Sequence, residues 1–445
     1  MKKWVLLLIL FVSVVMHAYA FELIRPTEKK SIVNTNYAFF YGKAKGYESI
    51  SINDERVYIA PNGAFAHSVK LKDGENRIMV RSTYGMQIYN IYKNTIKNQE
   101  IPTEDFSPRK AYVKCDNTPL RSTPVDAGLN RMSHLYQGTS LLINGSKGSF
   151  YRVFLSKNKQ GWIAKDAVVV VNSDSEGMGE FLGMNSERFK NAIIQTISFT
   201  KHLPYTIEDT DKEILFRVYN PELSEDSVYN INIPKPDKYI YSVKMDEGEY
   251  TFKVKKLTEN INECTIVVDA GHGGAEKGAI GCLGDEEKDI NLNIAIQLAQ
   301  MLKAEGFNVI MTRDYDSNLS LNDRVQIAKD NEADIFVSIH LNSIPDIPMD
   351  IHKNRGTSVY YFNKNSKDLA ESLVKNVTKT LGTRDDGVRT ASFAVIRPTN
   401  YIGVLVETAY MTNPLDSVIY GSKDFAQKAA KGICKGILEY FNSEG

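Results

Sequence analysis

Apolar and polar residues alternate along the first half of the chain, which is the pattern of half-buried β-strands. Between residues 21 and 92 the alternation includes pairs such as Ile50 with Ile52 and Ile78 with Val80. Turn signals such as PNG at 61–63 separate the apolar runs. Similar strand-rich stretches continue to about residue 256. The pattern predicts several N-terminal all-β modules.

The pattern changes near residue 264, where short apolar runs begin to alternate with segments of helical period. One helical stripe starts at Ile290 and continues through Ile294 and Leu298. We expect further helices near 321–331, 367–381 and 423–442, and strands at 265–269, 308–312, 335–339, 357–362 and 404–406. This alternation predicts an α/β catalytic domain with a mostly parallel sheet covered by helices on both faces.

The N-terminus has the features of a secretory signal peptide over residues 1–20. Two lysines precede an apolar run, and the small-x-small site AYA follows it at 18–20. The run is shorter than the ~20 residues that span a bilayer, and no later run is longer and equally apolar. We therefore expect an exported protein, periplasmic or associated with the cell wall, with no membrane span after signal cleavage.

Three β-rich modules and one linker are expected between the signal peptide and the α/β domain. The stretch from "ISIND" to "IMVRS" resembles immunoglobulin-like modules of secreted bacterial proteins, and "GTSLLINGSKGSFYRVFLS" with Trp162 resembles bacterial SH3-type domains. The predicted boundaries are 21–95 for an immunoglobulin-like sandwich, 96–110 for a polar linker, 111–171 for an SH3-type barrel, 172–260 for a β-rich domain of unknown family, and 261–445 for the catalytic domain.

Charge and cysteine content narrow the class of protein. Lys plus Arg and Asp plus Glu both number 54, so the whole chain has no electrostatic footprint for nucleic acid. The four cysteines are too sparse for a disulfide framework. The sequence leaves open whether any pair is bridged, and Cys264 with Cys282 or with Cys434 is possible.

Four chemically capable residues fall at strand ends or at the start of a helix. His272 follows the first strand of the α/β domain within a glycine-rich turn, and His340 ends the strand "DIFVSI". Glu287 begins the first helix, and Glu407 ends the strand "VLV". Because ligands bind at the carboxyl ends of strands in such sheets, the two histidines and Glu287 predict a metal site, with Glu407 as a base.

Several segments in order resemble the zinc-dependent N-acetylmuramoyl-L-alanine amidase family: "VVDAGHGG", "EKDINLNIA", "DIFVSIHLNS" and "VLVETAYMTN". The resemblance implies one Zn²⁺ bound by His272, Glu287 and His340, with Glu407 catalytic. It implies cleavage of peptidoglycan between N-acetylmuramic acid and L-alanine, for wall remodelling, cell separation or lysis. Asn342 and Arg397 occupy similar positions and are expected to contact substrate, and the β modules are expected to tether the enzyme to the wall.

The sequence departs from the family pattern in two places that matter. Glu286 directly precedes Glu287 and is the alternative ligand. Some members carry a helix that blocks the zinc after the second histidine, whereas only a short segment with Pro345 and Pro348 precedes Gly356 here. We therefore expect an active site that its own chain does not occlude.

Other function classes stay in competition with the amidase. A zinc carboxypeptidase acting on wall peptides would use the same residue types, and a non-catalytic peptidoglycan-binding protein would use the β modules alone. A cysteine peptidase would need Cys282 as nucleophile with His272 or His340. A dinucleotide-binding fold is disfavoured, because "GHGGAEKG" lacks the G-x-G-x-x-G spacing that such a fold needs.

Overall fold

A computed structural model describes residues 21–44, 49–83, 85–94, 101–171, 177–222, 224, 227–246, 248–344 and 347–443. The predicted signal peptide, residues 1–20, lies outside the described residues. Among those described, no helix has the length and apolar character needed to cross a membrane.

The N-terminal unit is a sandwich of two β-sheets. The strand orders are β1-β3-β6 and β2-β8-β7-β4-β5. Alternate residues of the strands, among them Phe40, Ile52 and Val80, are fully buried between the sheets. The strands are β1 (Phe21–Arg25), β2 (Lys30–Val33), β3 (Tyr37–Ala44), β4 (Ile50–Ile52), β5 (Glu55–Val57), β6 (Ala64–Lys70), β7 (Gly74–Ser82) and β8 (Gly85–Lys93).

A seven-stranded antiparallel sheet follows, in the order β11-β10-β14-β13-β12-β9-β15. Its elements are β9 (Thr103–Val113), β10 (Thr118–Arg121), β11 (Arg131–Leu135), β12 (Ser140–Lys147), β13 (Phe150–Ser156), β14 (Lys159–Ala164), the 3-10 turn η1 (Lys165–Ala167) and β15 (Val168–Val171).

The predicted linker over residues 96–110 is wrong from Thr103 onward, because these residues lie in β9 and pair with β12. The register shifts between Asp105 and Arg109, and Pro108 falls inside this irregular stretch. A proline is tolerated in a strand where the ladder is interrupted, since it has no N–H to donate. The polar composition of these residues therefore led to a linker being predicted where a strand forms.

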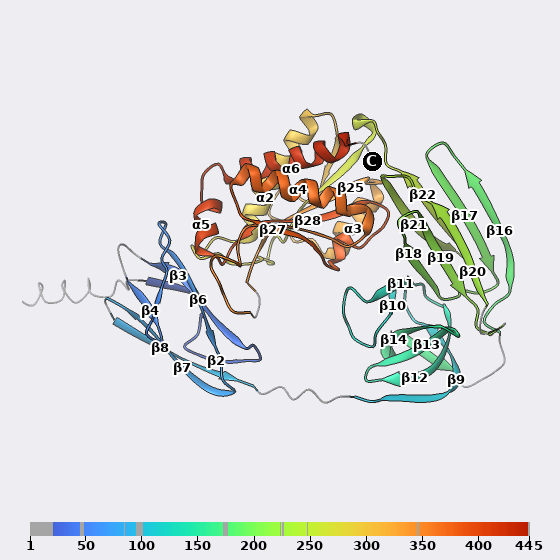
Figure 1. Cartoon of the computed structure of the whole chain (residues 1–445), viewed down its shortest axis with the longest axis horizontal. Coiled ribbons are helices and arrows are strands. Elements are labelled where there is room, and N and C mark those ends of the chain that lie inside the picture. Colours follow the sequence, from blue (N-terminus) through green and yellow to red (C-terminus); the bar gives the residue numbers. More distant parts are fainter. Residues whose placement is uncertain are drawn as a thin grey trace, which may run out of the picture.

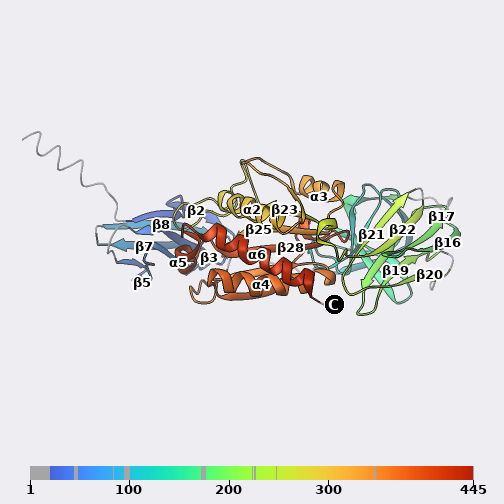
Figure 2. The same ribbon diagram turned by 90° about the horizontal axis from the view of Figure 1, so that it is seen from above.

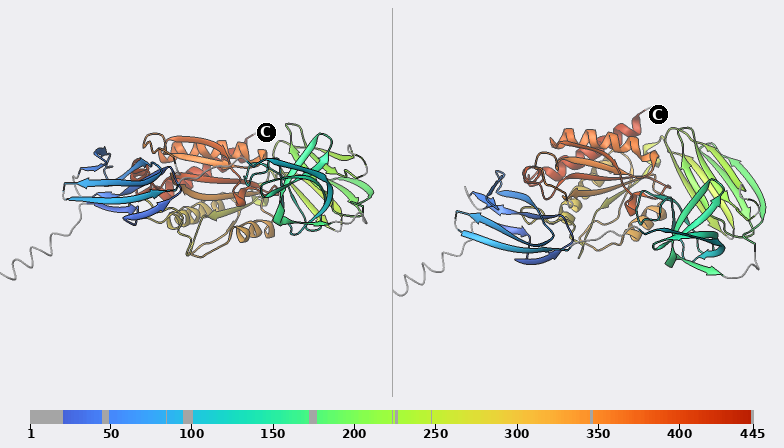
Figure 3. Two further views of the ribbon diagram at one scale, coloured as in Figure 1. Left: turned by 90° about the horizontal axis from the view of Figure 1, so that it is seen from below. Right: turned by 60° about the horizontal axis from the view of Figure 1, so that its bottom comes forward.

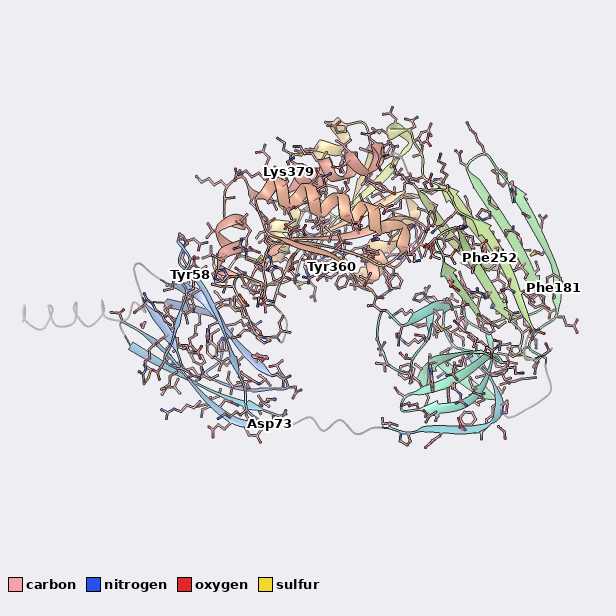
Figure 4. The ribbon with its side chains drawn as sticks, in the orientation of Figure 1. Tyr58, Asp73, Phe181, Phe252, Tyr360 and Lys379 are labelled. Carbon is pink, nitrogen blue, oxygen red and sulfur yellow. The ribbon has the colours of Figure 1, made fainter. Side chains whose placement is uncertain are left out.

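The next unit is a second two-sheet arrangement, with orders β16-β17-β22-β21 and β18-β19-β20. Figure 4 labels Phe252, whose side chain is fully buried in the interior of this unit, and Phe181, which lies on the outer strand β16. The strands are β16 (Phe181–Arg188), β17 (Ala192–Phe199), β18 (Tyr205–Asp209), β19 (Glu213–Tyr219), β20 (Val228–Pro234), β21 (Tyr239–Asp246) and β22 (Glu249–Lys256).

The strands β9–β15 and β16–β22 share a single hydrophobic cluster. We therefore treat residues 101–256 as one unit and call it the middle unit. The cluster joins Leu135 and Leu141 of the first sheet to Tyr205 and Tyr250 of the second. Ser140 N donates to the His202 carbonyl at 2.8 Å across the same contact. The predicted boundary near residue 172 therefore separates two sets of strands but not two cores.

The C-terminal domain contains a six-stranded sheet in the order β24-β23-β25-β28-β26-β27. The first four strands are mutually parallel, and β26 runs antiparallel to β28. The elements are η2 (Ile261–Glu263), β23 (Thr265–Ala270), α2 (Glu287–Ala304), β24 (Asn308–Met311), α3 (Leu321–Asp330), β25 (Ile335–Asn342), β26 (Thr357–Tyr361), η3 (Lys364–Ser366), α4 (Lys367–Leu381), β27 (Asp385–Thr390), η4 (Ala394–Ile396), β28 (Ile402–Tyr410), α5 (Pro414–Tyr420) and α6 (Phe425–Asn442).

Helices cover both faces of this sheet, one more heavily than the other. On one face α2, α4 and α6 bury a large cluster that includes Leu298, Leu373 and Ile433. On the other face α3 and η4 cover a smaller cluster around Phe336 and Tyr401. Figure 2 shows α4 and α6 side by side along the sheet.

The β units lie at opposite ends of the C-terminal domain (Figure 1). The N-terminal sandwich, in blue, contacts α5 through β6. The middle unit, in teal and green, lies at the other end, where Tyr241 N donates to the Thr399 carbonyl at 2.9 Å. Both views of Figure 3 keep the same order. Because Thr399 precedes β28, the middle unit contacts the amino ends of the parallel strands.

Candidate metal centre

Three residues of the predicted site converge at the carboxyl ends of β23 and β25. The ligand atoms of His272, Glu287 and His340 all lie within 4.8 Å of one another. The Glu287 carboxylate is 2.9 Å from Nδ1 of His340 and 3.3 Å from Nε2 of His272. Two imidazoles and one carboxylate form the donor set that Zn²⁺ takes in hydrolytic enzymes, so these residues fit that ion.

The carboxylate of Glu287 is buried and held from several sides. Ala279 N donates to its Oε2 at 2.8 Å, and Leu341 N donates to its Oε1 at 3.1 Å. Burial alone would raise its pKa, but hydrogen bonds to His272 and His340 hold the pKa well below the ordinary value for a carboxyl. Glu287 therefore stays ionised, as a metal ligand must.

Glu286, the alternative ligand from the sequence, faces away from the histidines. Its carboxylate pairs with Lys277 and lies 3.6 Å from Lys288. These ion pairs, led by the Lys277 hydrogen bond, lower its pKa. The structure thus brings Glu287, and not Glu286, into the cluster of His272 and His340.

Glu407 lies on the strand beside His340, and the two residues are register partners between β25 and β28. Its Oε2 is buried and has no hydrogen-bond partner among the described residues. Burial, with the negative charge of Glu287 added, raises the pKa of Glu407 well above the ordinary value. A raised pKa brings a carboxylate nearer to the range in which it exchanges protons at neutral pH.

Buried polar side chains hold the backbone that carries His272. Arg324 donates to the His272 carbonyl at 2.7 Å and pairs with the fully buried Asp269. Arg313 donates to the Ala270 carbonyl at 2.9 Å. His272 itself has φ = +59°, a left-handed conformation that is uncommon outside glycine and that such contacts must stabilise.

The backbone also approaches the site closely at Gly278. A Cβ on this residue would lie 2.5 Å from Oε2 of Glu287 and 2.7 Å from Cδ2 of His272. Gly278 has φ = +71°, so both its conformation and its surroundings require glycine.

Sequence reasoning missed two residues that support this geometry. Asn291, fully buried one helical turn after Glu287, donates to the Glu287 carboxylate and to the Gly271 carbonyl, each at 3.3 Å. Arg313 follows β24 in the segment "TRD". The position of Asn291 at i+4 from Glu287 was a usable signal, because such pairs face each other on a helix.

The two predicted substrate contacts have different locations. Asn342 ends β25, two residues after His340, and its side chain accepts from Ser343 N at 2.8 Å. Arg397 lies beside η4, before β28 begins, at the opposite end of the sheet. It donates to the Ser392 carbonyl at 2.8 Å, and no contact among the described residues joins it to the cluster. The structure does not bring Arg397 to the predicted site.

The four cysteines are free thiols, so neither disulfide that the sequence left open is formed. Cys282 is fully buried, and burial raises the pKa of its thiol. A nucleophilic cysteine needs a lowered pKa and access to substrate. The cysteine peptidase interpretation is therefore wrong.

The segment between His340 and β26 contains no helix among its described residues, 343–344 and 347–356. Met349 N instead donates to Ser68 Oγ of the N-terminal sandwich at 2.9 Å. No helix of this segment covers the cluster within the described residues.

Comparison with known proteins agrees with this site. Residues 266–439 match the family described as N-acetylmuramoyl-L-alanine amidase. The chain is 30% identical over 198 residues to the germination-specific N-acetylmuramoyl-L-alanine amidase of Bacillus subtilis (strain 168), covering 40% of this chain and 81% of that protein. It is 39% identical over 181 residues to N-acetylmuramoyl-L-alanine amidase LytC of the same organism, covering 40% of this chain and 35% of that protein.

Among solved structures, the catalytic domain of CwlV, an N-acetylmuramoyl-L-alanine amidase from Bacillus (Paenibacillus) polymyxa var. colistinus, is 35% identical. The match covers 41% of this chain and 99% of that chain, with a TM-score of 0.38. The matches fall on the C-terminal domain, and the chain spans about a third of LytC. Through this domain, the chain belongs to the N-acetylmuramoyl-L-alanine amidase family.

Proposed function

We propose that the C-terminal domain, residues 261–445, is a zinc-dependent N-acetylmuramoyl-L-alanine amidase of an exported protein. It hydrolyses the amide between the lactyl group of N-acetylmuramic acid and the L-alanine of the stem peptide. The observation that carries the proposal is the convergence of His272, Glu287 and His340 with Glu407 on the neighbouring strand.

Each residue has a distinct role in this proposal. His272, Glu287 and His340 hold the ion, which when bound lowers the pKa of a coordinated water and polarises the scissile carbonyl. Glu407 accepts the proton of the attacking water and delivers it to the leaving amine. Its raised pKa and unpartnered Oε2 suit a group that must carry a proton between these two steps.

The test is substitution of Glu407 by Gln. We expect turnover of purified peptidoglycan to fall by about 10²–10⁴-fold, because the general base is lost, while bound zinc stays near one ion per chain. Mass spectrometry of the products and elemental analysis of the protein measure the two quantities. Loss of zinc together with activity would instead make Glu407 a ligand.

Two matched variants of the adjacent carboxylates complete the experiment. Glu287→Gln should release zinc, whereas Glu286→Gln should retain it. A zinc carboxypeptidase would release single terminal residues, and a binding protein would release nothing. The amidase must release stem peptides with a free L-alanine amine.

We also propose that the β units bind the wall, as an immunoglobulin-like module at 21–95 and an SH3-type module at 111–171 would do. Sedimentation with purified wall tests this proposal. The full chain should sediment more completely than residues 257–445 alone, and equal sedimentation would refute wall binding by the β units.

A further inference from the structure

The N-terminal sandwich is docked against the metal end of the C-terminal domain. Asn62 Nδ2 donates to Ser417 Oγ, in α5, at 3.0 Å. Around this bond, small and aromatic residues of the sandwich, including Tyr41 and Ala64, share a buried cluster with Cys282. Buried apolar contact together with hydrogen bonds fixes the two bodies against each other.

A half-open cavity of about 510 Å³ lies between the docked bodies. This volume is in the range of about 300–1,000 Å³ that small-molecule sites occupy. Its sandwich wall comes mainly from β3, β2 and the segment between β1 and β2. The opposite wall comes from the loops before α2 and after β25. The residues of these walls that matter below are Arg25, Glu28, Gly278, Ala279 and Ser343.

The second wall is the backbone that surrounds the metal cluster. Ala279 N donates to the Glu287 carboxylate, and Gly278, which also lines the cavity, lies against both Glu287 and His272. Ser343 lines the cavity three residues after His340. The cavity therefore lies next to the metal cluster, and the backbone of residues 278–279 forms the wall between them.

The sandwich wall carries two exposed opposite charges. Arg25 and Glu28 make no ion pair among the described residues, and the Arg25 guanidinium interacts with the Tyr41 side chain, which lines the same cavity. A guanidinium without a carboxylate partner at the wall of a cavity is suited to a planar carboxylate, because its remaining N–H groups can bind both oxygens. Glu28, three residues away, is suited to an amine.

We propose that this cavity is the stem-peptide subsite of the amidase and that Arg25 binds a carboxylate of the peptide beyond L-alanine. The proposal rests on the proposed function. N-acetylated sugars are uncharged, whereas the stem peptide carries carboxylates and an amine of its diamino acid. The charges of the cavity wall therefore favour the peptide over the glycan, and the N-terminal sandwich determines substrate specificity.

The kinetic test compares the full mature chain with its Arg25→Ala variant on two soluble substrates. For an N-acetylmuramoyl tripeptide, we expect KM to rise about tenfold or more with kcat nearly unchanged, because a charge-assisted hydrogen bond is lost. For N-acetylmuramoyl-L-alaninamide, which has no peptide carboxylate, kcat/KM should stay within about twofold. Unchanged kinetics on the tripeptide, or an equal loss on both substrates, overturns the proposal.

Two controls separate charge from folding. Arg77→Ala removes an exposed arginine from β7 of the same sandwich, outside the cavity, and should leave both substrates unaffected. Arg25→Lys should recover part of the tripeptide affinity. Thermal midpoints within about 2 °C of the parent chain show that the sandwich remains folded.

Equilibrium binding keeps this proposal distinct from the amidase assignment. If the parent chain cleaves neither substrate, the proposed function fails. Calorimetric titration of the tripeptide into Glu407→Gln, with and without Arg25→Ala, still measures the subsite. A tenfold weaker Kd in the double variant supports the role of Arg25, and equal Kd values overturn it.

Discussion

Two adjacent glutamates at the start of α2 have different partners. Glu286 pairs with lysines, whereas Glu287 contacts both histidines. Sequence spacing could predict Glu287, His272 and His340, since strand ends and the helix start converge in such a sheet. Spacing could not predict Arg313, whose role is to donate to backbone carbonyls. Arg397 was expected at the site from the family resemblance alone, and the structure places it before β28 begins, at the other end of the strand.

We expect His134, in the middle unit, to make the stability of the protein depend on pH. Burial, with Arg131, Arg397 and Arg121 nearby, lowers its pKa from 6.5 to about 4. The neutral ring faces the Arg131 guanidinium at 3.1 Å, an arrangement in which Arg131 donates and the ring accepts. Protonation would replace this contact with a repulsion between two cations.

The unfolded chain therefore binds more protons than the folded chain between about pH 4 and 6.5. The stability contributed by neutral His134 is fully present above pH 6.5 and is lost as the pH falls towards 4. We expect the thermal midpoint to drop more steeply over this window in the parent chain than in His134→Gln. Parallel curves for the two proteins would contradict the assignment.

At the scale of elements, α4 and α6 pack unusually close at Gly432. A Cβ on this residue would lie 2.8 Å from the Cα of Val377, which is main chain and cannot rotate away. The helical stripe of α6 was predictable from its period. The need for glycine was not, because it arises from the neighbouring helix.

Gly432→Ala should destabilise the protein by about 1–3 kcal/mol through overpacking, although alanine favours an isolated helix by about 1 kcal/mol. Urea denaturation measures the change. Lys431→Ala, at an exposed position of the same helix, should stay within about 0.5 kcal/mol of the parent. A stabilised Gly432→Ala variant would show that the helices separate readily.

The strands were predictable to different degrees. The buried parallel strands β23 and β25 are continuous apolar runs and were expected at nearly their observed bounds. The edge strand β27 has the polar sequence DDGVRT and gave no signal. The reversed direction of β26 was also hidden, since an alternating pattern is the same in both directions.

At the scale of the whole molecule, the two sets of strands in the middle unit share one hydrophobic core. Tyr205 donates to the His134 carbonyl at 2.8 Å, and its ring packs against Tyr250. A side chain of the second set of strands thus bonds to the backbone of the first sheet. No alternation of residues could reveal this, because the pattern identifies buried faces but not their partners.

We expect a fragment of residues 101–256 to unfold in a single transition in urea. Leu135→Ala in the first sheet and Phe216→Ala in the second should each lower the urea midpoint of this one transition. Each should reduce the free energy of unfolding by about 2–5 kcal/mol. Near-ultraviolet circular dichroism and amide exchange of each sheet report the transition. Two separate transitions would show independent domains.

The contact between Asn62 and Ser417 joins positions 355 residues apart. During synthesis at about 5–20 residues per second, the sandwich emerges tens of seconds before the helix on which it docks. A chain that stops before α5 would present Tyr41 and its apolar neighbours to solvent. The cavity thus cannot form before Thr412, its last wall residue, has been made, so selection of substrate begins only when nearly the entire polypeptide is complete.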